Sequence, residues 1–407
     1  MLNSEMNPSR PEVSSPIVRA GIPAYAPSVG LLWMGAGVLA GGLLFSLWLG
    51  LAALAAMLRL PVPSPGLPAL GLLVGGGLFR EGRRIARGEP DGPWPGGEAW
   101  TLRQTLISLW ILVGCGAMVE IFSPRLSILI LPFHLGVATL GSFLVFNLLC
   151  WRLQAPWSRR AAWWALGLGS LLVPALAIFL EGIVGVALGL LMLALRILVE
   201  GPGFLNRWFP QGFAPERLSM PPEGLVRDPW LWIGILILAV IGVPAIEEAL
   251  KSLPVGLRMR DPAASGVSLI LYGAMGGAGF ALAESMLSWQ PGIPWTFTAI
   301  GRLGATALHV LNGGLMGWAW DRARRGRFLE GAVVYLFAWL LHGLWNAGAI
   351  VLSGLFIAPL SPEARALALP PAMVGMGAVL LLVIGGLGWA LPMLGKAEAS
   401  RHPRYGE

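Results

Sequence analysis

Charge is scarce in this chain. Only 12% of its 407 residues are Asp, Glu, Lys or Arg, whereas 56% are hydrophobic; an average soluble domain has roughly 25% charged residues. No water-soluble core of this size could hide the apolar surplus, which excludes a soluble globular protein. The composition therefore predicts that lipid is the solvent for most of the chain.

Cysteine, aspartate and the usual protease motifs are also scarce or missing. Cys115 and Cys150 are the only cysteines and lie inside apolar segments, so no disulfide framework is implied. HExxH, GxSxG and GxGD are absent, and the four aspartates lie in loops or at the ends of apolar segments. Serine and aspartyl intramembrane mechanisms are thus unsupported. The net charge is +7, but the arginines flank apolar runs instead of forming one stripe, which argues against a nucleic-acid partner.

What the chain has in abundance is long apolar runs. About 20 residues are needed for one helical crossing, and the runs do not alternate as the strands of a barrel do. The sequence predicts an all-α polytopic membrane protein with ten or eleven spans. The strong candidates are 29–57, 126–151, 303–320, 331–358 and 371–395, and the weaker ones are 66–79, 104–119, 161–180, 182–195, 229–246 and 266–289.

The arginine clusters predict the orientation. Clusters at 80–87, 152–160, 258–260 and 322–327 should all be cytoplasmic by the positive-inside rule, and the N-terminus with them. A tight hairpin over 161–195, turning at Glu181-Gly182, would place the two late clusters outside. Either that stretch crosses once as a long tilted or kinked helix, or 200–228 hides a re-entrant excursion.

Composition also divides the chain. We expect a disordered tail over 1–28, because this segment is polar and rich in Pro and Ser and lacks the short apolar stretch and cleavage site of a signal peptide. An N-terminal transmembrane region is expected over 29–199. A Gly/Pro-rich linker or re-entrant segment should cover 200–228, a helical bundle 229–395, and a polar tail 396–407. The membrane is expected to be the cytoplasmic membrane; the oligomeric state is not predicted.

Ionisable residues inside membrane segments are functional candidates by default. Glu247, Glu248 and Lys251 form EEALK at the end of one apolar segment, where Lys251 can pair with either carboxylate; alone, this pattern is equally typical of a helix end entering water. Glu284 lies one turn after Phe280 inside another segment. Upstream of it, Gly273-xxx-Gly277 predicts close helix packing.

Two of the four histidines lie in the next two segments. His309 precedes Asn312, and His342 lies four residues before Asn346, on one helical face. A single buried histidine is more often an ordinary hydrogen-bonding partner between helices. Together with three glutamates in neighbouring segments, the two histidines favour one shared polar site.

Such a site has the components for hydrolysis. A buried carboxylate can act as general base toward water, and histidine or amide groups can hold the water, protonate the leaving amine or stabilise an oxyanion. The same groups could bind a divalent metal such as zinc, with Glu284, His309 and His342 as candidate ligands. Whether the mechanism is metal-assisted or uses glutamate alone stays open.

In order, EExxK, FxxxE, a histidine-bearing segment and HxxxN resemble the PrsW family of intramembrane proteases, within the wider clan of CAAX prenyl endopeptidases and bacteriocin-processing enzymes. The resemblance covers about 229–395. It implies that Glu247 activates water, with Glu248 and Lys251 completing its motif. It assigns Phe280 and Glu284 to the second motif and His309 to the third. His342 and Asn346 would serve the oxyanion or leaving group.

The implied substrate is a membrane-associated protein or peptide, and its identity does not follow from the motifs. Two other classes of function remain open. A transporter or proton-coupled carrier could use the same buried Glu and His residues. An inert membrane scaffold could retain them as structural hydrogen bonds, in which case they would not converge on one cavity.

Overall fold

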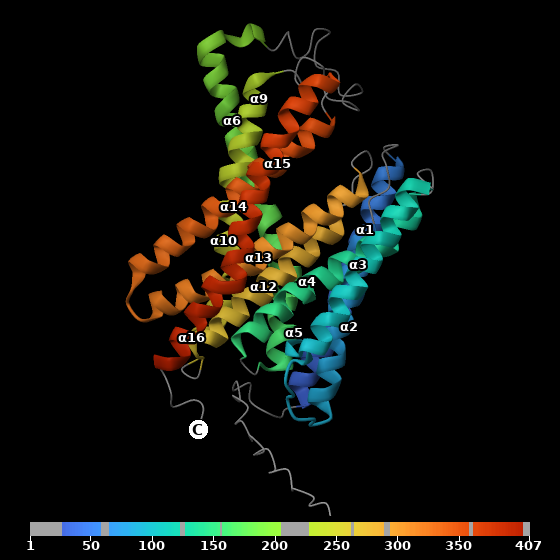
Figure 1. The fold of residues 1–407 in the computed structure, drawn as a ribbon, viewed down its shortest axis with the longest axis vertical. Helices are drawn as coiled ribbons and strands as arrows, with labels where there is room; N and C mark the ends of the chain where they lie inside the picture. Colours follow the sequence, from blue (N-terminus) through green and yellow to red (C-terminus); the bar gives the residue numbers. More distant parts are fainter. Residues whose placement is uncertain are drawn as a thin grey trace, which may run out of the picture.

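The computed structural model describes residues 27–57, 65–122, 127–154, 157–204, 228–261, 264–288, 294–357 and 361–401. Its regular structure there is helical (Figure 1), which confirms the all-α prediction. The N-terminal tail and most of the 200–228 linker lie outside the described residues, whereas the predicted C-terminal tail is helical as far as Arg401. The helices are α1 Pro27–Met57, α2 Gly66–Ala86, α3 Ala99–Phe122, α4 Leu131–Leu153, α5 Arg159–Gly167, α6 Val173–Glu200, α9 Pro229–Ile237, α10 Val243–Lys251, α11 Leu253–Arg258, α12 Gly266–Leu287, α13 Trp295–Arg324, α14 Phe328–Ile357, α15 Pro362–Gly385 and α16 Leu391–Arg401.

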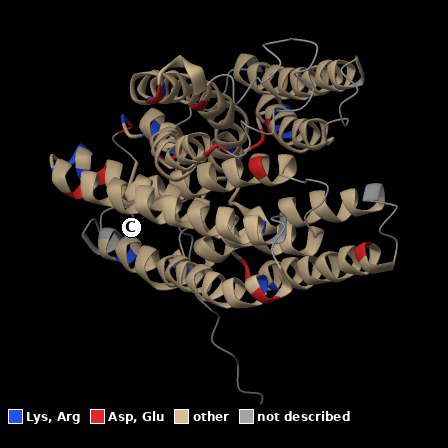
Figure 2. Cartoon of the chain, turned by 90° about the horizontal axis from the view of Figure 1, so that it is seen from above, with Lys and Arg blue, Asp and Glu red and all other residues tan. Residues whose placement is uncertain are grey.

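The protein is a polytopic integral membrane protein. Among the described residues, eight helices are long and apolar enough to cross a membrane. Few charges interrupt them (Figure 2). Two further long helices, α2 and α13, carry more polar residues and pack along α1 and α12. With these two the described bundle has ten long helices, of which eight qualify as candidate spans, whereas ten or eleven spans were predicted.

Three π-helical turns join successive helices into longer ones. They are Leu168–Leu172, Leu238–Gly242 and Gly386–Ala390, and in each case a proline is the second residue of the helix that follows. Proline has no N–H and cannot complete the regular ladder. A π-bulge is one way for a helix to continue past it.

The first of these turns decides how residues 161–195 cross. Arg159–Glu200 is one continuous helix of 42 residues, so the hairpin at Glu181-Gly182 is wrong and the alternative of one long helix agrees with the structure. The π-turn of Leu168–Leu172 carries the helix past Pro174, and α6 then runs without a break through Glu181 and Gly182. With one crossing here in place of two, all four arginine clusters can lie on the same side of the membrane, as the positive-inside rule predicts.

The arginine clusters indeed gather at one end of the bundle. Glu81 of α2 is buried and accepts a hydrogen bond from Arg159 at 2.9 Å. On α12, the Tyr272 ring lies 5.3 Å from the ring of Trp157 and 5.7 Å from the guanidinium carbon of Arg258. The clusters of 80–87, 152–160 and 258–260 are thus neighbours.

The fourth cluster and the start of α1 lie at the same end. Arg324 donates to the carbonyl of Ala264, just before α12, at 3.0 Å. A Cβ on Gly30, near the start of α1, would touch the backbone of Ala86 at the end of α2. At the opposite end, Glu120 of α3 accepts from the backbone N–H of Thr296 at 3.1 Å. The ten long helices therefore alternate in direction.

The core of the bundle is the pair α12–α13. Nearly every residue of α12 is buried. A Cβ on Gly273 would overlap the carbonyl of Gly313, and one on Gly277 would overlap the carbonyl of His309. Only glycine allows the two backbones to come this close. The predicted packing role of Gly273-xxx-Gly277 is thus confirmed. We call this backbone-to-backbone contact between α12 and α13 the α12–α13 seam, and both Glu284 and His309 lie along it.

Candidate active site

The site begins with the EEALK segment, which lies on α10 inside the bundle. Glu247, Glu248 and Lys251 are all buried. Lys251 Nζ donates to Glu248 Oε1 at 2.8 Å and to Glu247 Oε2 at 3.1 Å. Both predicted pairings are present. A helix end emerging into water would leave these side chains exposed, so that alternative is wrong.

Helices α12 and α13 supply the second part of the site. Glu284 Oε2 lies 2.8 Å from His309 Nε2. The same carboxylate makes a two-pronged pair with Arg302, at 2.8 Å through Nη1 and 2.6 Å through Nη2. Arg302 also donates through Nε to Ser285 Oγ at 3.1 Å. Glu284 is therefore fixed by a planar guanidinium, a geometry that only arginine provides.

His342 of α14 joins the cluster from the other side. Its Nδ1 lies 2.7 Å from Glu248 Oε1, and its Nε2 lies 3.7 Å from Glu247 Oε2. The rings of His309 and His342 are nearly perpendicular, with centroids 5.1 Å apart. His309 and His342 each lie midway along a helix of 30 residues. The cluster is thus deep within the membrane-spanning bundle.

The partners determine which ring nitrogen of each histidine carries hydrogen. An ammonium has only hydrogens to offer and an ionised carboxylate only accepts. His309 Nδ1, 2.7 Å from Lys251 Nζ, must therefore be the accepting nitrogen, and Nε2–H donates to Glu284. In the same way, His342 donates through Nδ1–H to Glu248. His342 Nε2 then faces Glu247.

This arrangement matches a metal site. Glu247, His309 and His342 offer three ligand atoms that all lie within 4.8 Å of one another. Two histidines and one glutamate form a common catalytic zinc set. Each histidine also donates its other ring N–H to a carboxylate, the usual arrangement behind a metal-bound imidazole. Glu284, predicted as a ligand, instead supports His309, and Glu247 takes its place in the group.

Asn346 lies one turn beyond His342, as predicted, but its amide is engaged elsewhere. Asn346 Nδ2 donates to the carbonyl of Ala239 at 2.9 Å. In a π-turn the partner of that carbonyl is five residues on, and here it would be Pro244, which has no N–H. Asn346 thus satisfies a carbonyl that the bulge leaves without a backbone donor. Tyr335, on the same helix, donates to the carbonyl of Ala245 at 2.8 Å.

The other two predicted polar or aromatic residues also border the site. Phe280 is buried, with its ring centroid 4.6 Å from Lys251 Nζ and 5.2 Å from the His309 ring. It covers the ammonium with the electron-rich face of an aromatic ring. Asn312 is buried and donates to the carbonyl of Ala338 at 3.0 Å, which links α13 to α14 one turn from His309.

Two residues near the site were not recognised in the sequence. Arg302 lies immediately before the predicted span 303–320 and looked like an ordinary flanking arginine. Glu181 was assigned to a hairpin turn, but it lies within α6, where it interacts electrostatically with Glu247, Glu284 and Lys251. The sequence did contain a signal for Glu181: it is an acidic residue between two apolar runs with no basic residue near it in the chain.

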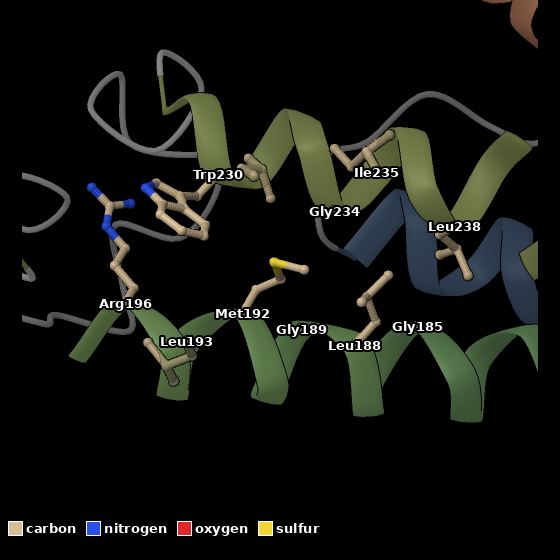
Figure 3. Close-up of a pocket in the computed structure, with 11 residues that line it drawn as sticks. Gly185, Leu188, Gly189, Met192, Leu193, Arg196, Trp230, Gly234, Ile235 and Leu238 are labelled. Carbon is tan, nitrogen blue, oxygen red and sulfur yellow. The ribbon is translucent and has the colours of Figure 1, made fainter. Parts of the chain in front are cut away.

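An apolar groove lies between α6 and α9, apart from the cluster (Figure 3). Its volume is about 300 Å³, and its lining runs from Arg196 and Trp230 at one end to Leu238 at the other. None of the predicted site residues lines it. Arg196 there pairs with Asp228 and Glu200.

Comparison with known proteins gives one result. Residues 225–382 match a family model whose description is PrsW family intramembrane metalloprotease. The matched segment contains α9 to α14 and most of α15, and hence all the site residues except Glu181. No curated protein and no solved structure matches the chain.

Proposed function

Residues 225–382 are a PrsW family intramembrane metalloprotease domain, and from this premise we propose that the cluster of Glu247, Glu248, Glu284, His309 and His342 is its active site. Membership of this family implies peptidase activity. The proposed reaction is hydrolysis of a peptide bond in a membrane-associated protein or peptide. The supporting observation is that side chains from four helices converge, by hydrogen bonds and ion pairs, in the middle of the bundle.

In the proposed mechanism Glu247, His309 and His342 hold a divalent ion such as zinc. The bound ion would supply a Lewis acid and an activated water at neutral pH. Glu284 and Glu248 orient the two imidazoles by accepting from their N–H groups. Glu247 has a second carboxylate oxygen that can take a proton from the attacking water, which keeps the water-activating role expected of it.

Arg302 and Asn346 have supporting roles in this mechanism: one positions a side chain of the site and the other stabilises developing negative charge. Arg302 holds Glu284 through two hydrogen bonds, so that His309 keeps its orientation. One N–H of the Asn346 amide binds Ala239, and the amide has a second N–H that can donate to an oxyanion. We propose this second N–H as the contribution of Asn346 to the reaction.

The substrate and the orientation are part of the same proposal. The end of the bundle that carries the arginine clusters faces the cytoplasm by the positive-inside rule. With this orientation the start of α1 and the end of α16 would lie on the cytoplasmic side, and we propose that the membrane is the cytoplasmic membrane. The buried position of the site fits an apolar polypeptide segment that reaches it from the bilayer.

The test is cleavage of a quenched-fluorescent apolar transmembrane peptide by the full chain in lipid vesicles. Glu247→Gln and His342→Ala should each lower the rate by at least about 10³-fold. Glu247→Gln removes the carboxylate proposed to accept the proton of water, and His342→Ala removes a proposed metal ligand. The matched controls Glu363→Gln, at an exposed position, and His402→Ala should retain activity. Undiminished cleavage by Glu247→Gln and His342→Ala would refute the assignment of the site.

A further inference from the structure

Lys251 stands where a metal ion would bind. Its ammonium contacts Glu247 Oε2 at 3.1 Å and His309 Nδ1 at 2.7 Å. These atoms belong to two of the three residues that could ligate an ion. Because His309 Nε2–H is used by Glu284, Nδ1 carries the only lone pair that His309 can offer a metal. Lys251 therefore covers the ligand atom that the ion needs.

We propose that the Lys251 ammonium and the metal ion are alternative occupants of one position, so that metal binding requires the ammonium to withdraw from Glu247 and His309. This inference rests on the proposed metal-assisted function. It goes beyond that function because it assigns Lys251 the role of a built-in competing cation that sets metal affinity.

The structure also offers a place to which the ammonium can move. Glu248 is completely buried and uses only Oε1, which accepts from Lys251 and from His342. Its other oxygen, Oε2, has no hydrogen-bond partner among the described residues. A shift of Nζ toward Oε2 would satisfy this oxygen, keep the Lys251–Glu248 pair and free His309 Nδ1. The bond from His342 to Oε1 would not change.

Electrostatics explains why a competing cation is useful. Without a metal ion and without Lys251, Glu247 and Glu248 would be two adjacent buried carboxylates with no cation beside them, and unpaired buried charges are costly. Lys251 stabilises the metal-free bundle, with Phe280 packed against its ammonium. When an ion arrives, two cations cannot share Glu247 and His309. Metal affinity is thus lowered by the work of displacing the ammonium.

The experiment measures Zn²⁺ affinity of the full chain in detergent by competition with a chromophoric chelator. Lys251→Met keeps an unbranched side chain only one heavy atom shorter and removes the charge, and we expect it to bind Zn²⁺ about tenfold more tightly or better. Arg258→Met is the matched control, because it removes a positive charge from the adjoining helix α11, over Tyr272. Its affinity should stay within about twofold of wild type.

A second pair of variants tests the withdrawal itself. Glu248→Gln removes the carboxylate that receives the ammonium, so it should weaken Zn²⁺ binding although Glu248 is not a ligand. In Lys251→Met/Glu248→Gln there is no ammonium to move, so only the weaker support of His342 remains, and Glu248→Gln should cost less Zn²⁺ affinity in the Lys251→Met background than in wild type. The double variant also removes both charges of one buried pair, which keeps the test available if Lys251→Met alone fails to fold.

The outcomes separate this inference from the proposed function. Unchanged or weaker Zn²⁺ binding by both variants that carry Lys251→Met would overturn the competition. Absence of Zn²⁺ binding in every variant would overturn it too. Peptide cleavage that depends on Glu247 and His342 could still be present in that case, because the cleavage assay does not depend on measured metal affinity.

Discussion

The helix pairs α1–α2 and α12–α13 use the same device for opposite purposes. In both, glycines let two antiparallel helices touch backbone to backbone: a Cβ on Gly37 would overlap the carbonyl of Gly75, just as one on Gly277 would overlap that of His309. Around α12 the other helices leave almost nothing exposed, whereas most of α1 is exposed. Close packing is therefore not what marks the active site.

What differs is the polar content of the seam. In α12–α13 the close approach places Glu284 beside His309 and Arg302. In α2 the buried acid, Glu81, pairs with Arg159 and Arg160 of α5, and not with α1. The α1–α2 pair is thus an apolar hairpin that presents α1 to lipid, and the α12–α13 pair is a scaffold that holds ionisable groups within the membrane.

The largest effect should come from breaking the α12–α13 seam. Gly277→Leu forces a side chain into the His309 backbone, and overpacking of this kind costs about 1–3 kcal/mol or more. Because His309 itself would shift, peptide cleavage should fall below detection and the melting temperature in detergent should drop. Gly354→Leu, on α14 with nothing within 4 Å, is the control and should resemble wild type. Full activity in Gly277→Leu would contradict the close contact.

The sequence predicted some contacts of the site and of the α12–α13 seam and missed others. The spacing of EEALK predicted both pairs of Lys251, and Gly273-xxx-Gly277 predicted the close approach. Arg302 was missed because arginines at span ends usually reach the interface, and only the fold shows it turned toward Glu284. The hairpin at Glu181-Gly182 was wrong because α6 continues as a helix through both residues, and a single glutamate and glycine between two apolar runs do not distinguish a turn from one long helix.

The geometry of the metal group was beyond the sequence for a related reason. Glu247, Glu284, His309 and His342 come from four different helices, and spacing along one helix does not tell which of two glutamates turns toward a histidine of another. The position of Glu284 depends on Arg302, and that of Glu247 on the π-turn at 238–242 that precedes α10. The structure thus brings these four predicted residues together, but Glu247 stands in the group of possible metal ligands where Glu284 was expected.

A smaller effect is expected from removing the polar support of the α12–α13 seam while its packing is kept. Arg302→Met deletes both hydrogen bonds to Glu284, and hydrogen bonds to charged groups contribute about 1.5–3 kcal/mol. Loss of a residue that orients a metal ligand typically lowers activity about 10–100-fold. Thermal melting and peptide cleavage measure the two effects separately.

The double variant sharpens this second test. In Arg302→Met/Glu284→Gln no unpaired carboxylate is left, so much of the lost stability should return while cleavage stays impaired. Recovery of both would mean that the pair serves only the fold. Recovery of neither would mean that Arg302 acts through Ser285, to which it also donates at 3.1 Å.

The smallest effect should follow from breaking the α1–α2 seam. Gly37→Leu forces a side chain against the Gly75 backbone and should detach α1, which packs mainly on α2. Because α1 contributes no group to the ionisable cluster, cleavage of an apolar peptide should stay within about twofold of wild type, although the melting temperature falls by a few degrees. Gly42→Leu, on the same helix with nothing within 4 Å, should change neither. A loss of cleavage in Gly37→Leu as large as that in Gly277→Leu would show that the α1–α2 hairpin takes part in catalysis or in substrate entry. The two seams would then differ in their surroundings and not in their function.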